Sequence, residues 1–180
     1  KYLYEKKAGG YRLNTDFKEE KFDFGRMFGF AYGEKENGAV FSHMAVMYAN
    51  ALYKRGFIKE GYKVLKNLLD SAMDFENSIM YPGIPEYFDN DGRGLYAYLT
   101  GAASWYMLTM ITEVFGVRGE LGNLVIKPAL LPEQFDKDGK AAIKLNFSGR
   151  TLKITIHADI DNIQDNNGVY NKIIRVECDG

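Results

Sequence analysis

Cysteine, tryptophan and histidine are scarce in this sequence of 180 residues, which has one cysteine, one tryptophan and two histidines. The single cysteine, Cys178, excludes an internal disulfide and fits a reducing compartment, so we expect a cytoplasmic protein. His43 and His157 are far apart and paired cysteines are missing, so a zinc site is not expected. No dinucleotide-binding or phosphate-loop glycine motif is present, and none therefore indicates a nucleotide cofactor.

A strong excess of charge of one sign is also missing. The net charge is -1, so no basic surface predicts binding to nucleic acid or to an anionic membrane. No apolar run approaches the ~20 residues that span a bilayer. The sequence starts at Lys1 with neither a start methionine nor a leader, and we expect it to begin inside a longer protein.

Aromatic residues, by contrast, are abundant, with 13 tyrosines and 12 phenylalanines. Tyrosine suits clefts that are half apolar and half wet, as sugar sites are, and it suits ordinary cores equally well. Composition alone therefore leaves the class of function open, and the local patterns have to decide it.

Apolar residues at helical spacing predict two consecutive helices early in the chain. Residues 39–56 (AVFSHMAVMYANALYKRG) carry basic residues in the last turn and end at Gly56. Residues 58–75 follow a short turn that contains glycine, and we expect the two helices to form an antiparallel hairpin. The apolar stripe of the second helix is expected to consist of Tyr62, Leu65, Leu68 and Leu69.

A third helix is predicted over residues 101–115 (GAASWYMLTMITEVF), ending at Gly116. It is apolar on nearly all sides, which is typical of a helix that is buried on both sides. Residues 1–38 are expected to be loop with short strands. Residues 77–94 carry two prolines and several glycines, and predict a long loop that is functional or mobile.

After the third helix the sequence changes to short alternating or β-branched segments separated by Gly, Asp and Asn. Residues 143–147 and 152–156 alternate apolar and polar side chains, and Ser148-Gly149 between them predicts a hairpin turn. Two further strands are expected in residues 123–128 and 172–180. Helices followed by strands predict an α+β fold with two structural units.

Charged residues crowd into the segment GEKENG, Gly33 to Gly38, directly before the helix that carries His43. The glycines permit tight turns. Carboxylates and an ammonium can grip sugar hydroxyls, because charge-assisted hydrogen bonds are about twice as strong as neutral ones. The imidazole of His43 would face the same cleft. A polar turn followed by a core histidine has the same pattern, so both readings stay open here.

The start of the third helix is a second candidate. Thr100 is a good N-cap, and the small residues after it, beginning with Gly101, would leave the first helical N–H groups open to an anion. A capped helix with nothing bound fits the same residues. The loop before it could supply Glu86 as a carboxylate and Tyr87 as an aromatic platform for a sugar, or these residues simply shape the loop.

Four segments together resemble the inverting glycoside phosphorylases of the cellobiose and chitobiose phosphorylase family (glycoside hydrolase family 94). They are GEKENGAVFSH, PGIPEY, YLTGAASWYMLTMITEVFGVRG and GNLVIKPALLPEQFD, in the order in which the family has them. The resemblance extends from about Gly25 to Asp159. GYRLNTDF with AYGEKENGAVFSHMAVMYANALYKRG looks closest to the branch that acts on β-1,2-linked glucooligosaccharides.

The resemblance implies an N-terminal β-sandwich, a linker, an (α/α)6 barrel that houses the active site, and a C-terminal jelly-roll-like sheet. Residues 1–118 would be the last helices of the barrel, and residues 119–180 the closing antiparallel β-domain. The missing N-terminal part of the same enzyme, an oligosaccharide and phosphate are the implied partners. A homodimer is also implied, and neither nucleic acid nor a membrane is expected.

The reaction implied is phosphorolysis of a β-glucosidic bond in a di- or oligosaccharide, giving α-glucose 1-phosphate with inversion. Inorganic phosphate is a co-substrate, and no cofactor is implied. The family's phosphate-binding histidine and Thr-Gly pair match His43, Thr100 and Gly101, and its sugar-binding lysine and glutamate match Lys35 and Glu36. Glu86 and Tyr87 are expected to be further sugar contacts.

The family's catalytic aspartate belongs to an upstream loop that has no match here, and its phosphate-binding arginine could be matched only by guessing Arg12 or Arg26. We therefore expect this chain to carry half an active site and to be inactive alone. One alternative is a hydrolase on the same helical barrel, in which Glu34, Glu36 or Glu86 activates water ~6.5–9.5 Å from the acid. The other is a non-catalytic carbohydrate-binding module.

Overall fold

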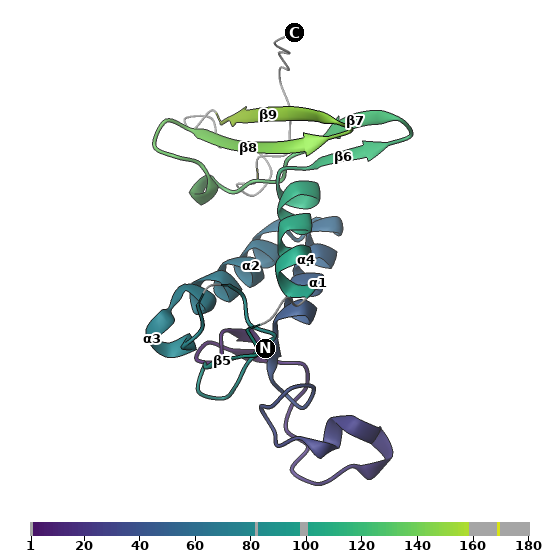
Figure 1. Cartoon of the computed structure of the whole chain (residues 1–180), viewed down its shortest axis with the longest axis vertical. Helices are drawn as coiled ribbons and strands as arrows, with labels where there is room; N and C mark the ends of the chain where they lie inside the picture. The colour runs from purple at the N-terminus through teal and green to yellow at the C-terminus, as the bar shows by residue number, and fades with distance from the viewer. Residues whose placement is uncertain (1, 82, 98–100, 159–168, 170–180) are drawn as a thin grey trace. The chain divides into compact units, whose positions relative to one another are not determined.

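The computed structural model describes residues 2–81, 83–97, 101–158 and 169. Within this part of the chain, helices combine with antiparallel strands, so the predicted α+β class is confirmed. The chain divides into two compact units, Lys1–Thr109 and Met110–Gly180, and each is described by itself (Figure 1). Thr100 and the predicted strand at 172–180 lie outside the described residues.

The first unit is mainly helical, with short strands between the helices. In chain order its described elements are β1 (Tyr4–Glu5), β2 (Gly10–Tyr11), the 3-10 helix η1 (Phe22–Gly29), β3 (Val40–Phe41), α1 (Ser42–Lys54), α2 (Ile58–Met73), α3 (Phe75–Ser78), β4 (Tyr87–Phe88), β5 (Gly94–Leu95) and α4 (Gly101–Thr109). The predicted loop with short strands before α1 therefore also contains a 3-10 helix, which the sequence pattern did not indicate.

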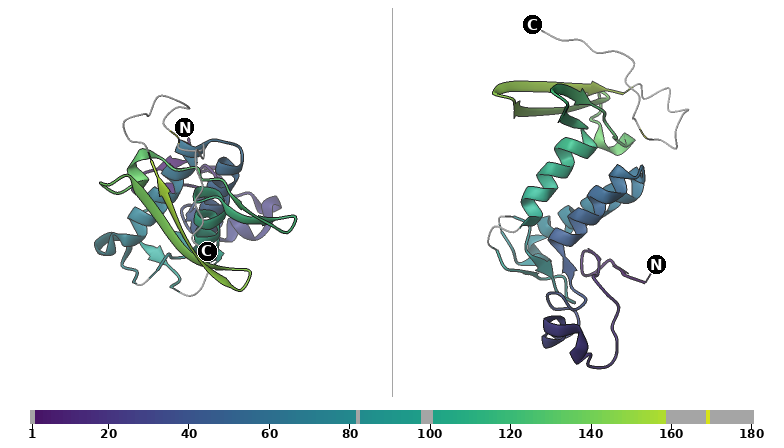
Figure 2. Two further views of the ribbon diagram at one scale, coloured as in Figure 1. Left: turned by 90° about the horizontal axis from the view of Figure 1, so that it is seen from above. Right: turned by 90° about the vertical axis from the view of Figure 1, so that its right-hand side faces the viewer.

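The helices predicted from periodicity are present, and their packing forms the core of the first unit. Gly56 ends α1 with a φ of 82°, a conformation that glycine adopts without strain, and its N–H donates to the Tyr53 carbonyl at 2.9 Å. Gly61 lets α2 approach α1 closely, because a Cβ there would lie 2.6 Å from Tyr53 Cδ2. Helix α4 packs on α1, and Figure 2 shows it beside the α1–α2 pair.

The buried face of α2 differs from the predicted stripe. Leu65 and Leu68 are buried as expected, but Leu69 is 40% exposed and Tyr62 is only half-buried. A helix advances about 100° per residue, so the face that α2 turns to α1 follows positions four and three residues apart. That face consists of Ile58, Gly61, Val64, Leu65, Leu68 and Ala72.

Two further predictions for this unit were wrong. The segment expected to be one long loop includes the end of α3, the strand β4 and the first residue of β5. β4 pairs with β3 and with β5 in a three-stranded antiparallel sheet. Helix α4 is not buried on both sides, since Met107 and Leu108 are 61% and 45% exposed. An apolar composition shows that a helix can be buried, but the neighbours that would cover it have to be present as well.

The second unit is built from two antiparallel hairpins. Its described elements are the π-helical turn η2 (Met110–Val114), β6 (Val117–Glu120), β7 (Asn123–Ile126), the 3-10 helix η3 (Pro132–Gln134), β8 (Lys140–Phe147) and β9 (Arg150–His157). The predicted strand at 123–128 is present as β7, and it pairs with β6. The buried hydrophobic residues described in this unit are Val114, Val117, Leu130, Leu131 and Ala141.

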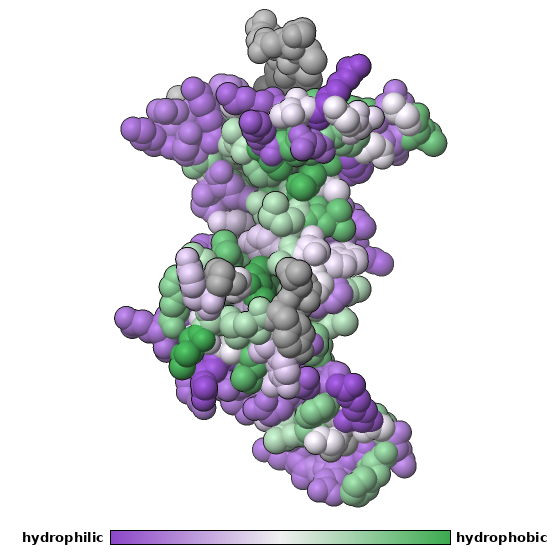
Figure 3. All heavy atoms as spheres, viewed as in Figure 1, coloured by the Kyte–Doolittle hydropathy of each residue, from purple (hydrophilic) through white to green (hydrophobic). Residues whose placement is uncertain are grey.

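The β8–β9 hairpin confirms the alternation of the sequence. Ser148 and Gly149 both have positive φ, 50° and 76°, as a two-residue turn of the favoured hairpin type requires. Leu145 pairs with Leu152, and Ile143 with Ile154, which puts the apolar side chains on one face. The opposite face carries lysine, threonine and asparagine, and Figure 3 shows many hydrophilic side chains over this hairpin. His157 lies exposed at the end of β9.

Within the described ranges, no helix is long and apolar enough to cross a bilayer.

Candidate functional site

The charged segment between Gly33 and Gly38 folds into a tight loop. The N–H of Gly33 donates to the Asn37 carbonyl at 2.6 Å, and the N–H of Asn37 donates to the Glu34 carbonyl at 2.9 Å. Lys35, between them, has a φ of 41°, in the left-handed region that residues other than glycine seldom adopt. The loop therefore presents its charged side chains from a backbone that hydrogen bonds hold in place.

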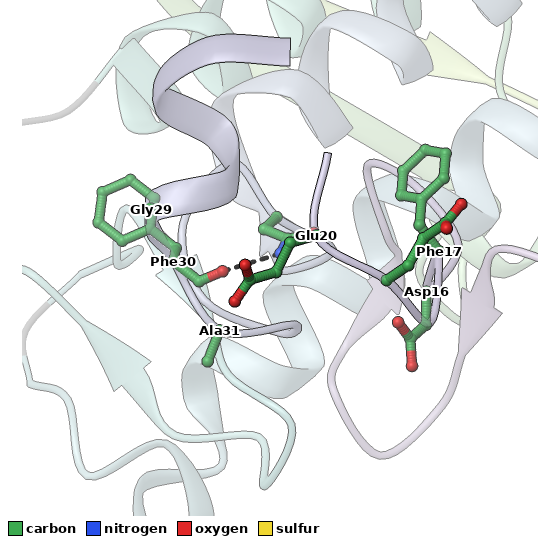
Figure 4. A pocket seen from close by; sticks show the side chains of 8 residues that line it. Asp16, Phe17, Glu20, Gly29, Phe30 and Ala31 are labelled. Carbon is green, nitrogen blue, oxygen red and sulfur yellow. Dashed lines mark hydrogen bonds between the residues drawn. The ribbon is translucent and has the colours of Figure 1, made fainter. Parts of the chain in front are cut away.

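Asn37 fastens this loop to the preceding chain. Its side chain is only 9% exposed, and its Nδ2 donates to the Phe30 carbonyl at 2.8 Å, the bond drawn in Figure 4. Its Oδ1 accepts a hydrogen bond from Asn14 Nδ2 at 3.3 Å. The asparagine of the motif is therefore committed to the loop's own structure.

Lys35 lies between a carboxylate and an aromatic ring. Its Nζ is 3.8 Å from Glu86 Oε2 and 3.9 Å from the centre of the Tyr96 ring. The side chains of Lys35 and Glu86 are 18% and 22% exposed. The structure thus brings together two of the predicted sugar-binding residues, and adds Tyr96, which was not predicted.

Tyr87 lies behind this pair and is almost fully buried. It is 3% exposed, and its hydroxyl donates to Glu34 Oε2 at 2.7 Å. Burial first, and then the hydrogen bond to the Glu34 carboxylate, raise the pKa of Tyr87 well above its ordinary value. Its ring lies 5.9 Å from that of Tyr96, tilted by 39°. Tyr87 therefore packs behind Tyr96 as a buried residue, and its hydroxyl is already hydrogen-bonded to Glu34.

Glu36 faces a different neighbour. Its Oε1 is 3.5 Å from Arg26 Nη2, while its Oε2 is buried without a hydrogen-bond partner among the described residues. Arg12, the other arginine considered for phosphate, donates to the Gly38 carbonyl at 2.8 Å. Both arginines therefore help to hold the charged loop.

His43 and Gly101 meet at the start of α4. A Cβ on Gly101 would lie 2.5 Å from His43 Cε1, so only glycine leaves room for the imidazole where it stands. The ring lies 5.9 Å from that of Trp105. His43 Nε2 is buried and has no hydrogen-bond partner within the described part of the chain. Buried polar atoms usually have a hydrogen-bond partner, and residues 98–100, directly before Gly101, lie outside the described part of the chain.

Strand β4 connects the lysine group with the histidine. Phe41, at the end of β3, pairs with Tyr87. The N–H of Ser42, the residue before His43, donates to the Glu86 carbonyl at 2.8 Å. The two predicted groups therefore share one short sheet at the N-terminus of α1. In the described ranges, no three His, Cys, Asp or Glu side chains are arranged to hold a metal ion.

A surface hollow of about 320 Å³ lies next to the same loop (Figure 4). It shares Phe30 and Asn37 with the surroundings of the loop, and the carboxylates of Asp16, Glu19 and Glu20 make its lining acidic. An acidic lining repels an anion, so this hollow is unsuited to phosphate. The sequence-predicted site residues do not line it. Its lining consists of Asp16, Phe17, Glu19, Glu20, Gly29, Phe30, Ala31 and Asn37.

Sequence reasoning missed Tyr96 and the role of Glu34 as a partner of Tyr87. Glu34 and Tyr87 are 53 residues apart in the chain, and no local pattern links them. Tyr96 gave no local signal either, because Glu86 precedes β4 and Tyr96 follows β5, so their proximity depends on the pairing of these two strands. Taken together, the arrangement offers a lysine and carboxylates for a hydroxyl-rich ligand, and a histidine beside a helix start for an anion.

Comparison with known proteins gives a distant relative and no family model. No family model matches the chain. The chain is 26% identical over 147 residues to cellobionic acid phosphorylase from Neurospora crassa. The match covers 74% of this chain and 18% of the relative, so the chain spans less than a fifth of that protein's length. The similarity supports a distant relationship to a phosphorylase that acts on a carbohydrate.

Proposed function

We propose that this chain is part of a glycoside phosphorylase, which cleaves a β-glucosidic bond in a di- or oligosaccharide with inorganic phosphate. The products are α-glucose 1-phosphate, formed with inversion, and the shortened sugar. The observation that carries the proposal is the buried Nε2 of His43 beside Gly101, for which the described residues supply no hydrogen-bond partner. The similarity to a phosphorylase supports it independently.

Phosphate is proposed to bind between His43 and the start of α4. The imidazole would donate a hydrogen bond from Nε2 to a phosphate oxygen, and the first backbone N–H groups of α4 would donate further ones. Gly101 leaves the room that the ring needs. Thr100, which lies outside the described residues, is proposed to add its hydroxyl. Phosphate is a co-substrate in this proposal, and no cofactor takes part.

The sugar is proposed to lie against the charged loop. Lys35 and Glu86 form an ion pair with limited exposure, and together they offer both donors and acceptors to hydroxyl groups. Glu36 contributes an oxygen that is buried and has no hydrogen-bond partner among the residues that the structure describes. Tyr87 is proposed to close the site from behind, with its hydroxyl bound to Glu34.

The chemistry proposed follows the logic of an inverting glycosidase, with phosphate in place of an activated water. A carboxylic acid protonates the leaving oxygen, while a phosphate oxygen attacks the anomeric carbon from the opposite face. The bond to the leaving sugar breaks as the bond to phosphate forms, so the configuration inverts. No separate general base is needed, because phosphate is already a nucleophile. The general acid is proposed to be an aspartate supplied by a part of the enzyme outside this sequence.

The architecture proposed is that of glycoside hydrolase family 94, in its branch for β-1,2-linked glucooligosaccharides. Residues 1–118 would complete an (α/α)6 barrel, and residues 119–180 would form a jelly-roll-like β-domain. An exposed apolar stripe on α1 supports the presence of further helices, because such a stripe normally packs against another element. The stripe consists of Met44, Met47, Tyr48 and Ala51. A homodimer in the cytoplasm completes the proposal.

The test is an assay of the whole protein that contains this chain, on a panel of β-linked glucosides with and without phosphate. We expect glucose 1-phosphate to form only when phosphate is present. His43→Ala should abolish phosphorolysis and leave sugar binding in place, whereas His157→Ala, at an exposed position of β9, should behave like the wild type. Cleavage without phosphate would indicate a hydrolase instead. Sugar binding without any cleavage would indicate a binding module.

A further inference from the structure

We propose that Tyr96 is a positioning residue that holds the Lys35 ammonium at the place where it meets a sugar hydroxyl. This inference rests on the proposed function for the role of Lys35. The contact itself is given by the geometry, since Lys35 Nζ lies 3.9 Å from the centre of the Tyr96 ring. A cation at this distance from an aromatic face is attracted by the negative charge density of the ring.

The ammonium is bracketed from two sides by residues that are joined to each other. The N–H of Glu86 donates to the Tyr96 carbonyl at 3.2 Å and to the Leu95 carbonyl at 3.1 Å. The carboxylate of the same Glu86 lies 3.8 Å from Lys35 Nζ. Lys35 therefore closes a ring of contacts in which the two backbone hydrogen bonds of the Glu86 N–H fix the spacing between the carboxylate and the aromatic face.

The Tyr96 ring is itself supported from behind. Its neighbour Tyr87 is 3% exposed and anchored by the 2.7 Å hydrogen bond to Glu34. Tyr96 is 39% exposed, so one part of it rests on Tyr87 while another part remains open to solvent. Glu34 is next to Lys35 in the chain, and it is also linked to the Lys35 ammonium by the contacts of the Tyr87 and Tyr96 rings.

The backbone at both contact residues is in an uncommon conformation. Lys35 has a φ of 41° and Tyr96 a φ of 64°, although neither is glycine. Such conformations cost free energy, and they persist where surrounding contacts determine them. The side chains of Lys35 and Tyr96 contact each other, as expected where the backbone conformation positions one side chain for a ligand.

Holding the ammonium before the sugar arrives has a specific consequence. A free lysine side chain samples many rotamers, and binding a hydroxyl would then require it to lose that freedom. A lysine that is already bracketed binds without that loss. Removal of the Tyr96 ring should therefore weaken sugar binding and leave phosphate binding intact.

The experiment compares Tyr96→Leu and Tyr96→Phe in the whole protein that contains this chain. Tyr96→Leu is expected to raise the KM for the sugar about fivefold, with the KM for phosphate unchanged, while Tyr96→Phe, which keeps the aromatic face, restores the wild-type value. Tyr81→Leu, at a tyrosine that is 75% exposed and packs on Phe75, is the matched control and should leave both constants unchanged.

A second readout does not depend on activity. The rate at which an amine-reactive ester acylates Lys35, followed by peptide mass spectrometry, should rise about fivefold in Tyr96→Leu and stay unchanged in Tyr96→Phe. The exposed Lys59 serves as the internal reference. Equal acylation of Lys35 in all three proteins would overturn the inference, as would a changed acylation rate with an unchanged KM for the sugar. Altered acylation in a protein that cleaves no glycoside would instead refute the proposed function and leave the contact standing.

Discussion

At the scale of single residues, the tightest constraint in the site is the contact between Gly101 and His43. A Cβ at position 101 would lie 2.5 Å from Cε1, 2.7 Å from Nδ1 and 2.9 Å from Nε2 of the imidazole, so Gly101→Ala must push the ring aside. Gly101 is the first residue of α4, so the substitution leaves the hydrogen bonds of the helix interior in place. We expect the KM for phosphate to rise about tenfold in the whole protein, with little change in the thermal midpoint.

Gly29→Ala is the control for this substitution. A Cβ at position 29 meets no atom within 4 Å, and its backbone is not in the left-handed region. It should leave the KM for phosphate unchanged. If Gly101→Ala also kept the wild-type KM for phosphate, His43 would not be a phosphate contact.

Single residues also show how far the sequence alone could reach. Lys35, Glu36 and His43 were predictable as candidates, because charge, glycine and the start of a helix are local features. The structural role of Asn37 was not predictable, since its hydrogen bonds to Phe30 and Asn14 depend on how the chain folds back. Tyr96 was missed for the same physical reason, because a cation–π contact depends on distance in space and leaves no spacing pattern in the sequence.

At the scale of elements, Tyr106 links α4 to α2. Its hydroxyl donates to the Leu65 carbonyl at 3.4 Å, and burial raises the pKa of Tyr106 to about 12. A tyrosine in the unfolded chain has a pKa of about 10. Above that value the unfolded chain loses the proton first, so the free energy of unfolding should fall as the pH rises from about 10 to about 12. Below pH 10 this contribution to stability is fully present.

Urea unfolding of the chain between pH 8 and pH 11.5 checks this prediction. Tyr106→Phe removes one of the tyrosines whose pKa is raised in the folded chain, and should make the alkaline loss of stability shallower than in the wild type. Tyr81→Phe, which changes an exposed tyrosine, should keep the wild-type slope. A wild-type slope in Tyr106→Phe would mean that other groups dominate the alkaline unfolding.

Elements were predictable from the sequence in proportion to their length. The helices α1 and α2 and the hairpin of β8 and β9 extend over enough residues for a period of 3.6 or 2 to be visible. β4 and β5 have two residues each, which is too short for any period, and they escaped prediction. The exposure of α4 was not predicted either. An apolar side chain such as Met107 shows that a helix is suited to packing, but it does not show which neighbours the described residues provide.

At the scale of the whole molecule, the relevant fact is that the chain spans 18% of its relative. Under the proposed function, the exposed apolar stripe of α1 is expected to be covered in the complete enzyme. Met47, which is 38% exposed here, should be buried against further helices in the complete enzyme. A charged side chain at this position would cost little in the chain alone and considerably more in the complete enzyme.

Met47→Lys makes this difference measurable. Lysine is a good helix former, so α1 should persist, and in the isolated chain the free energy of unfolding should change by less than about 0.5 kcal/mol. In the complete enzyme the same substitution should lower the midpoint of thermal unfolding by several degrees and reduce phosphorolysis, because an unpaired charge would be buried. Lys59→Ala, at an exposed position of α2, should be neutral in both proteins. Equal shifts in the isolated chain and the complete enzyme would show that no further helix covers α1, and the barrel architecture would have to be abandoned.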